Sequence, residues 1–498
     1  MKNFRSIWGL IIFSFLLFSC EQEVIEKYEP VTEIPPVVET PTAGSAVFTK
    51  YVAIGNSLTA GYMNGALYTA GQDNSLAAQL AKQFELVGGG VFNQPDIESV
   101  NGFFGVAGGI VLGRLRLSAP TNTPVPIIPG DIPTLYEGNK SALNNFGVPG
   151  VTLLTALIPQ TGGPASPQNP AYNPLYARFA SNPGTSTLVG DAAAALADGG
   201  TFFTFWLGNN DVLGYAVGGA SNPNILTSVD DFRTRYNAAL GAMLAANATA
   251  KGMIANIPNV TDVPFFKTVL FNQIVFSQDQ AALVEQLNNG YAQFNQGIQA
   301  YNAGTLPGQT GPPPADQRRT TINFQVGKNA IVIADEDVPS LAAYGIPSIR
   351  QATATDLITL TAGSVLGTDA GNGPIGLQDP LGNQYVLTEK EVAFVKTRVD
   401  AFNVIISEAA IANTARVGLV DINAIFRQFA QTGFSGNNIF LSAVLAPPTG
   451  AFSLDGVHPN ARGYAFTANK FIEAINVKWS ATIPLINLAQ LPANELPQ

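Results

Sequence analysis

Four short apolar runs along the chain have the pattern of strands buried in a parallel sheet. The first run stops at Gly55 and the second stops at Gly208. Each is four to seven residues long, too short for a typical helix. The predicted strands are Tyr51–Ile54, Thr201–Leu207, Gly252–Ile257 and Val417–Asp421.

Helical patterns lie between these runs. Ser228 precedes Asp231 by three residues, and apolar residues then recur with a period of 3.6, as in an amphipathic helix. Thr388 and Glu391 form a capping box before a second such pattern, and Ser277 with Gln280 opens a third. Strands that alternate with helices predict an α/β layered domain around a parallel sheet.

Three long inserts separate the predicted elements, at about 65–140, 155–195 and 262–385. They are too long to be plain loops, so we expect them to form walls or lids around a site. The last insert also contains an apparent hairpin, in which 321–326 and 330–333 flank Gly327 and Lys328. We therefore predict one enlarged domain over 47–479, followed by a tail at 480–498.

The N-terminus resembles a bacterial targeting segment. Lys2 and Arg5 form a basic start, and Ile7–Phe18 is apolar but too short to span a bilayer as a helix. The following Leu17-Phe18-Ser19-Cys20 resembles a lipobox, which predicts a signal peptide at 1–19, lipidation of Cys20 and a Pro-rich tether over 20–46. The alternative is an ordinary signal peptide with an incidental cysteine. Lipidation would anchor the protein in the cell envelope, at the outer membrane or cell surface of a Gram-negative bacterium.

Composition excludes several classes of function. The chain has 498 residues, of which 12% are charged, and its formal net charge is −10. Without a basic patch to neutralise phosphates, we expect no nucleic-acid partner. One cysteine and one histidine cannot form a disulfide or a nitrogen–sulfur zinc site, so we expect no metal and no cofactor. Carboxylates alone could still hold Ca²⁺, but the sequence contains no EF-hand loop.

The single histidine directs attention to serine chemistry. His458 follows Asp455 by three residues, and an aspartate at that spacing can orient the imidazole as a general base. Ser57 stands directly after the first predicted strand, where a nucleophile faces the end of a parallel sheet. Taken singly, His458 can equally be an inert surface residue and Ser57 a helix N-cap.

Two further turns offer hydrogen-bond donors for an oxyanion. Asn210 follows the second predicted strand within Gly208-Asn209-Asn210-Asp211, and Gly150 closes Asn145-Phe146-Gly147-Val148-Pro149-Gly150. Each segment by itself is also an ordinary turn sequence.

In this order, Gly-x-Ser-Leu, Asn-x-Gly-x-x-Gly, Gly-x-Asn-Asp and Asp-x-x-His-Pro together resemble the motifs of the SGNH/GDSL hydrolases. The resemblance implies a flavodoxin-like three-layer α/β/α sandwich. It also implies that Ser57 is the nucleophile, His458 its base and Asp455 the orienting acid. The oxyanion donors would be the backbone N–H groups of Ser57 and Gly150 and the side-chain amide of Asn210. Spacing from Asn145 favours Gly150 over Gly147.

One position departs from the family pattern, because Asn56 stands where the family has aspartate. The resemblance implies an ester substrate, and the lipobox-like segment implies membrane attachment through Cys20. It leaves open an acyl-lipid esterase or lipase, a carbohydrate O-deacetylase, or a non-catalytic lipoprotein that binds glycan or lipid. Aromatic residues of the inserts could line an acyl pocket or belong to the core: Phe103, Phe104, Phe265, Phe266 and Phe271.

Overall fold

A five-stranded sheet forms the centre of the fold, and every pair of neighbouring strands in it is parallel. Its strand order is β6–β1–β7–β8–β15, which is 2-1-3-4-5 in chain order and therefore the flavodoxin-like arrangement. This confirms the predicted fold class. The strands are β1 (Tyr51–Gly55), β6 (Asn145–Gly147), β7 (Phe202–Trp206), β8 (Lys251–Ala255) and β15 (Val417–Val420).

Side chains of the strands alternate between two apolar layers. Val52 and Ile54 of β1 pack with one buried cluster, whereas Tyr51 and Ala53 pack with the other. Because both faces of the sheet are covered, these strands read in the sequence as continuous apolar runs.

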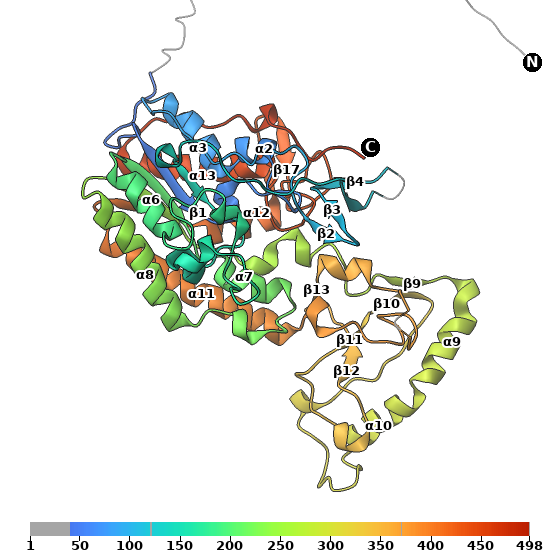
Figure 1. Cartoon of the computed structure of the whole chain (residues 1–498). Coiled ribbons are helices and arrows are strands. Elements are labelled where there is room, and N and C mark those ends of the chain that lie inside the picture. The colour runs from blue at the N-terminus through green and yellow to red at the C-terminus, as the bar shows by residue number, and fades with distance from the viewer. Residues whose placement is uncertain (1–39, 120–121, 370, 498) are drawn as a thin grey trace, which may run out of the picture. The chain divides into compact units, whose positions relative to one another are not determined.

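Helices cover the two faces of the sheet (Figure 1). On one face, α3 (Leu76–Glu85) packs against α13 (Ala461–Trp479), and both contribute to the cluster that contains Tyr51. On the other face, α8 (Val229–Ala246) packs between α6 (Leu188–Ala197) and α11 (Glu389–Ala412). The result is a three-layer sandwich.

The predicted caps begin helices in the structure. The Ser228 hydroxyl accepts a hydrogen bond from Asp231 N at the start of α8, and Thr388 forms a complete capping box with Glu391 at the start of α11. The Ser277 capping box opens a short 3-10 turn that continues into α9. The other helices are α1 (Ser57–Ala60), α2 (Thr69–Asp73), α4 (Leu153–Leu157), α5 (Pro174–Ala177), α7 (Asn210–Val217), α9 (Ala281–Gly290), α10 (Ala292–Ala303) and α12 (Ile422–Thr432).

The remaining strands form two-stranded antiparallel pairs outside the central sheet. Between β1 and β6 lie the pairs β2 (Gly105–Ala107) with β3 (Ile110–Leu112) and β4 (Leu115–Leu117) with β5 (Pro124–Pro126). The later pairs are β9 (Ile274–Phe276) with β10 (Gly327–Asn329), β11 (Val332–Ala334) with β12 (Ile349–Gln351), β13 (Leu357–Ile358) with β14 (Val386–Leu387), and β16 (Phe434–Gly436) with β17 (Ile439–Leu441).

The hairpin predicted for 321–333 is wrong. The predicted turn instead contributes β10, which pairs with β9, and the second half contributes β11, which pairs with β12, whereas the first half lies in no strand. Asparagine side chains instead satisfy the backbone of the first half. Asn288 bonds both the N–H and the C=O of Phe324, and Asn295 does the same for Ile322. These asparagines lie seven residues apart, so α9 and α10 present them along the extended segment.

The computed structural model describes residues 40–119, 122–369 and 371–497. The predicted signal peptide, Cys20 and most of the predicted tether lie outside these residues. Pro41–Gln498 forms one unit, and Ser45 N donates to Trp479 O within it. Among the described residues, no helix is both long and apolar enough to cross a membrane.

Candidate active site

Ser57 stands at the carboxyl end of β1 as the first residue of α1. The preceding residue, Asn56, caps this helix, because its Oδ1 accepts a hydrogen bond from Leu58 N at 3.0 Å. The Ser57 hydroxyl is therefore not used as a helix cap. Asn56 is buried, and its side chain makes the capping contact without a negative charge.

The imidazole of His458 links Ser57 to Asp455. The distance from Ser57 Oγ to His458 Nε2 is 2.8 Å, and the distance from His458 Nδ1 to Asp455 Oδ2 is 3.0 Å. With a neutral imidazole, Nδ1–H donates to the carboxylate and Nε2 accepts from the serine hydroxyl. The structure thus brings together three side chains that lie up to 401 residues apart in the sequence.

The loop from Asp455 to His458 closes on itself. Asp455 Oδ1 accepts hydrogen bonds from the N–H groups of Val457 and His458, each at 2.9 Å. Gly456 has a φ of +76°, and a Cβ there would lie 3.0 Å from Phe265 N. Glycine is therefore required for the turn to form against the 264–266 segment.

A second turn, at Asn64 and Gly65, holds this loop from the opposite side. Gly65 N donates to Asp455 Oδ2 at 2.9 Å. Asn64 N donates to Ser453 Oγ, and Asn64 Oδ1 accepts from Leu454 N. Sequence reasoning did not single out these residues. The Asn-Gly pair signals a turn, but it gives no sign of contacts across about 390 residues.

Asp455 is arranged to remain ionised. Burial alone would raise its pKa, but the charge of His458 and the hydrogen bonds from His458 and Val457 outweigh that effect. The pKa of Asp455 therefore lies below its ordinary value. An ionised carboxylate at this place stabilises an imidazolium that forms during a reaction.

The predicted oxyanion donors lie at the ends of three neighbouring strands. Ser57 follows β1, Gly150 follows β6 by three residues and Asn210 opens α7 after β7. Gly150 has a φ of +78°, and the nearest atom to a Cβ there would be 3.9 Å away, so the space beside its Cα is open. One hydrogen of the Asn210 amide is used on Val151 O at 2.8 Å, which fixes the orientation of the side chain.

Gly147 has a different role from Gly150. It lies inside β6, and its N–H donates to Asn145 Oδ1 at 2.9 Å. A Cβ at Gly147 would lie 2.4 Å from Ala60 N, so this glycine allows α1 to pack closely on the strand. Among the described residues, the Gly150 N–H has no acceptor, which leaves it available for a ligand.

Asp211, next to Asn210, is a buried acid that sequence reasoning did not assign to the site. Its Oδ2 accepts from Leu153 N, the first residue of α4, and its Oδ1 accepts from the Thr227 hydroxyl. Burial raises the pKa of Asp211 to about 6, against the effect of these hydrogen bonds. Asp211 therefore joins the start of α4 to the start of α7.

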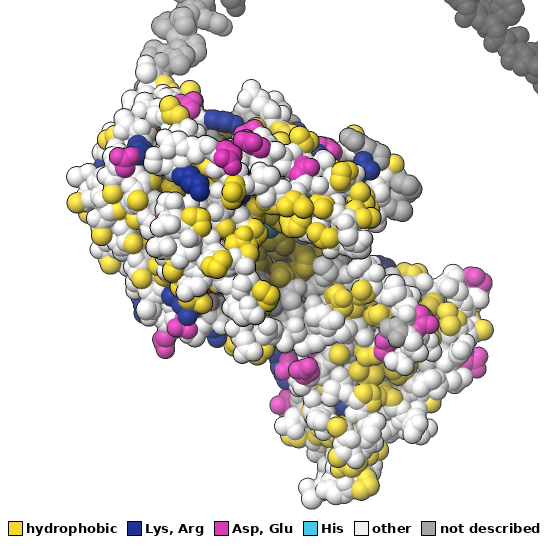
Figure 2. Space-filling view, in the orientation of Figure 1, with side chains coloured by type: hydrophobic (Ala, Val, Ile, Leu, Met, Phe, Trp, Pro, Cys, Tyr) yellow, Lys and Arg dark blue, Asp and Glu magenta, His cyan; other side chains and the backbone are white. Residues whose placement is uncertain are grey.

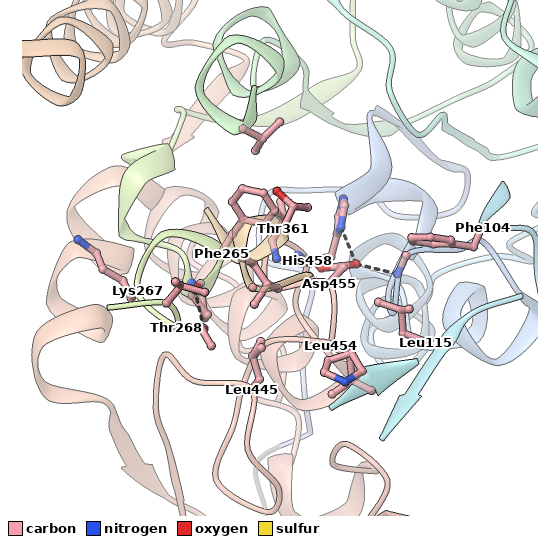
Figure 3. Close-up of a pocket in the computed structure, with 18 of the residues that line it drawn as sticks. Phe104, Leu115, Phe265, Lys267, Thr268, Thr361, Leu445, Leu454, Asp455 and His458 are labelled. Atoms are coloured by element: carbon pink, nitrogen blue, oxygen red, sulfur yellow. Dashed lines mark hydrogen bonds and ion pairs between the residues drawn. The ribbon is translucent and has the colours of Figure 1, made fainter. Parts of the chain in front are cut away.

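A large pocket of about 1820 Å³ opens at these residues. Tyr62, Gly150, Asn210, Asp455 and His458 all line it. Figure 2 shows hydrophobic side chains gathered in and around a hollow in this face of the molecule. In Figure 3, His458 and Asp455 lie in the middle of the pocket, with Phe104 and Leu115 on one side and Phe265 on the other. Of the aromatic residues noted in the inserts, Phe104 and Phe265 line the pocket, and Phe265 also belongs to the buried core together with Phe266.

No protein-family model matches the chain, and no curated protein sequence matches it. Among solved structures, it is similar to an extracellular lipase from Streptomyces rimosus, with a TM-score of 0.29 and 10% sequence identity over 86% of this chain and 99% of that chain. The fold assignment therefore depends on the topology of this chain itself. Fold and site together define an α/β protein of flavodoxin-like topology with a serine–histidine–aspartate arrangement. The arrangement lies where β1 and β7 are neighbours, which is the switch point of the sheet.

Proposed function

We propose that this chain is a serine hydrolase that cleaves carboxylic esters through an acyl-enzyme on Ser57. One observation carries the proposal: Ser57 Oγ, His458 Nε2, His458 Nδ1 and Asp455 Oδ2 form a hydrogen-bonded series at the sheet's carboxyl edge, and its members His458 and Asp455 line the pocket. A site at this edge is typical of ligand binding in open α/β sheets.

In the first half of the reaction, Ser57 Oγ forms a bond to the ester carbonyl carbon and its proton passes to His458 Nε2. The negative charge moves to the carbonyl oxygen, where Ser57 N–H, Gly150 N–H and the Asn210 amide donate hydrogen bonds. When the carbon–oxygen bond of the ester breaks, His458 returns the proton to the leaving alkoxide. The alcohol departs, and the acyl group remains on Ser57.

Water completes the reaction. His458 takes a proton from a water molecule, whose oxygen bonds to the acyl carbon, and the same three donors hold the oxyanion. The bond to Ser57 Oγ then breaks, and the proton on His458 passes to that oxygen. The carboxylic acid leaves, and the resting arrangement of Ser57, His458 and Asp455 is restored.

The direct test uses Ser57→Ala and His458→Ala with p-nitrophenyl acetate as substrate. We expect both variants to lose hydrolysis, and we expect a fluorophosphonate probe to label the wild type but not Ser57→Ala. Ser141→Ala, which removes an exposed serine hydroxyl, is the matched control and should retain both labelling and activity. Unchanged rates in both variants would disprove the mechanism, and a wild type without labelling or turnover would favour the non-catalytic binding protein.

We further propose that the protein is a lipid-anchored lipoprotein of the cell envelope, on the strength of the sequence around Cys20. Two or more acyl chains would give stable membrane attachment. Radioactive palmitate should label the wild type and not Cys20→Ser, and the variant should move from the membrane fraction to the soluble fraction. Equal labelling of both proteins would contradict lipidation at this residue.

A further inference from the structure

The walls of the pocket are apolar and come from segments far apart in the chain. The β4–β5 pair contributes Leu115 and Leu117, α7 contributes Leu213 and Val217, and two later segments contribute Phe265 and Leu445. At about 1820 Å³, the pocket exceeds the roughly 300–1,000 Å³ of sites for small ligands. It therefore has room for a ligand much larger than an acetyl group.

Charged groups are scarce along these walls. Among the described residues that line the pocket, only Lys267 and Asp455 belong to the charged types lysine, arginine, aspartate and glutamate. The carboxylate of Asp455 is already hydrogen-bonded to His458. Figure 3 shows Lys267 at the margin of the pocket, away from His458. Sugar recognition requires converging polar groups, and these walls offer few.

The hydroxyl groups of the wall are largely used within the protein. Thr268 Oγ1 donates to Pro264 O, and Ser364 Oγ donates to Thr361 O, each at 2.8 Å. Thr152 Oγ1 accepts from Thr155 N and caps α4. Because these bonds hold the hydroxyls to their own backbone segments, the surface toward the ligand is mainly methyl and methylene groups.

One face of α7 joins the oxyanion site to the apolar wall. Asn210, Leu213, Gly214 and Val217 recur at helical spacing, and all four line the pocket. A carbonyl oxygen bound to the Asn210 amide would therefore place the attached acyl chain beside Gly214 and Val217. A Cβ at Gly214 would meet only Ile225 Cδ1, at 3.8 Å, so the space beside this glycine is open.

We infer that the substrates are esters of long-chain fatty acids, whose acyl chain lies along the Asn210–Val217 face of α7. The inference rests on the proposed ester hydrolysis and names its substrate class. Acetylated glycans do not fit the same walls, because an acetyl group leaves the apolar surface unfilled and the sugar would face few free polar groups.

The test compares p-nitrophenyl esters from acetate to dodecanoate, below the concentrations at which they aggregate. Each methylene buried along α7 should raise kcat/KM about fourfold, and we expect a total rise of at least about 100-fold. Gly214→Leu should fill the open space and lower kcat/KM for the dodecanoate at least about 30-fold. It should lower kcat/KM for the acetate much less than kcat/KM for the dodecanoate. Gly241→Leu, at an exposed position of α8 with no atom near the new Cβ, is the control and should affect neither ester.

The outcomes separate the two proposals. If acetate hydrolysis depends on Ser57 but kcat/KM does not rise with chain length, or Gly214→Leu slows both esters equally, the substrate class is wrong and ester hydrolysis stands. Faster release of acetate from acetylated xylan than of dodecanoate would also overturn it. If neither ester is cleaved and Ser57 is not labelled by the fluorophosphonate, the proposed function itself is wrong.

Discussion

Replacing Asp455 by asparagine tests whether the carboxylate fixes the orientation and tautomer of His458. Both oxygens of Asp455 accept hydrogen bonds: Oδ1 from Val457 N and His458 N, and Oδ2 from Gly65 N and His458 Nδ1. An asparagine must turn its NH₂ group toward one of these two pairs of donors. If the NH₂ faces Nδ1, the imidazole must accept there, and its proton moves to Nε2, which can then no longer accept from Ser57.

The expected loss of kcat follows from this change of the His458 tautomer. A wrong tautomer at a serine–histidine–aspartate site typically costs about 10⁴-fold in kcat, or about 5 kcal/mol of transition-state stabilisation. If the NH₂ instead faces Val457 N and His458 N, the loop loses two hydrogen bonds to a charged acceptor. Either orientation should lower the free energy of unfolding by about 2–4 kcal/mol.

The assay measures kcat on a p-nitrophenyl ester and urea unfolding of the same samples. Asp191→Asn is the matched control, because Asp191 also accepts several hydrogen bonds, from Tyr176 and Ser181, but does not line the pocket. It should lose stability and keep its kcat. A fall of less than about tenfold for Asp455→Asn, with folding intact, would refute the role assigned to the carboxylate.

Three further predictions concern the residues around the catalytic series. Asn210→Ala should lower kcat about 10²–10³-fold with little change in KM, since the amide acts on the oxyanion. A rise in KM with an unchanged kcat would contradict this role. Asn64→Gly keeps the left-handed backbone (φ +54°) but loses the hydrogen bond to Leu454 N, which is worth about 1 kcal/mol, so kcat should fall up to about tenfold while the melting temperature changes little. Asp211 binds its proton more tightly when folded, so ionisation should lower stability by up to about 3 kcal/mol as the pH rises from about 4 to 6. Urea unfolding at pH 4 and pH 7 should show this loss of stability in the wild type and not in Asp211→Asn. The asparagine amide can donate to Thr227 and accept from Leu153, so the variant keeps both hydrogen bonds. Equal pH dependence in the two proteins would refute the role of Asp211 ionisation.

The local elements of the fold could be predicted from the sequence, because they depend on neighbouring residues. Four of the sheet strands were visible as apolar runs, since both of their faces are buried. β6 was not predicted as a strand, because only three residues, Asn145–Gly147, pair with β1 and two of them are not apolar. The hairpin at 321–333 failed for a related reason: alternation marks an extended segment but not its partner.

For the site, the sequence determined which chemistry was available. A single histidine with an aspartate three residues before it, and a serine at a strand end, restricted the choice of base and nucleophile. Only the tertiary structure decided what these residues touch. Strand order places the ends of β1, β6 and β7 side by side, so Ser57, Gly150 and Asn210 meet at one edge. The contact of Gly65 with Asp455 joins residues that lie 390 positions apart, and the apolar pocket is built from distant inserts. Both depend on long-range packing, which a local sequence pattern cannot predict.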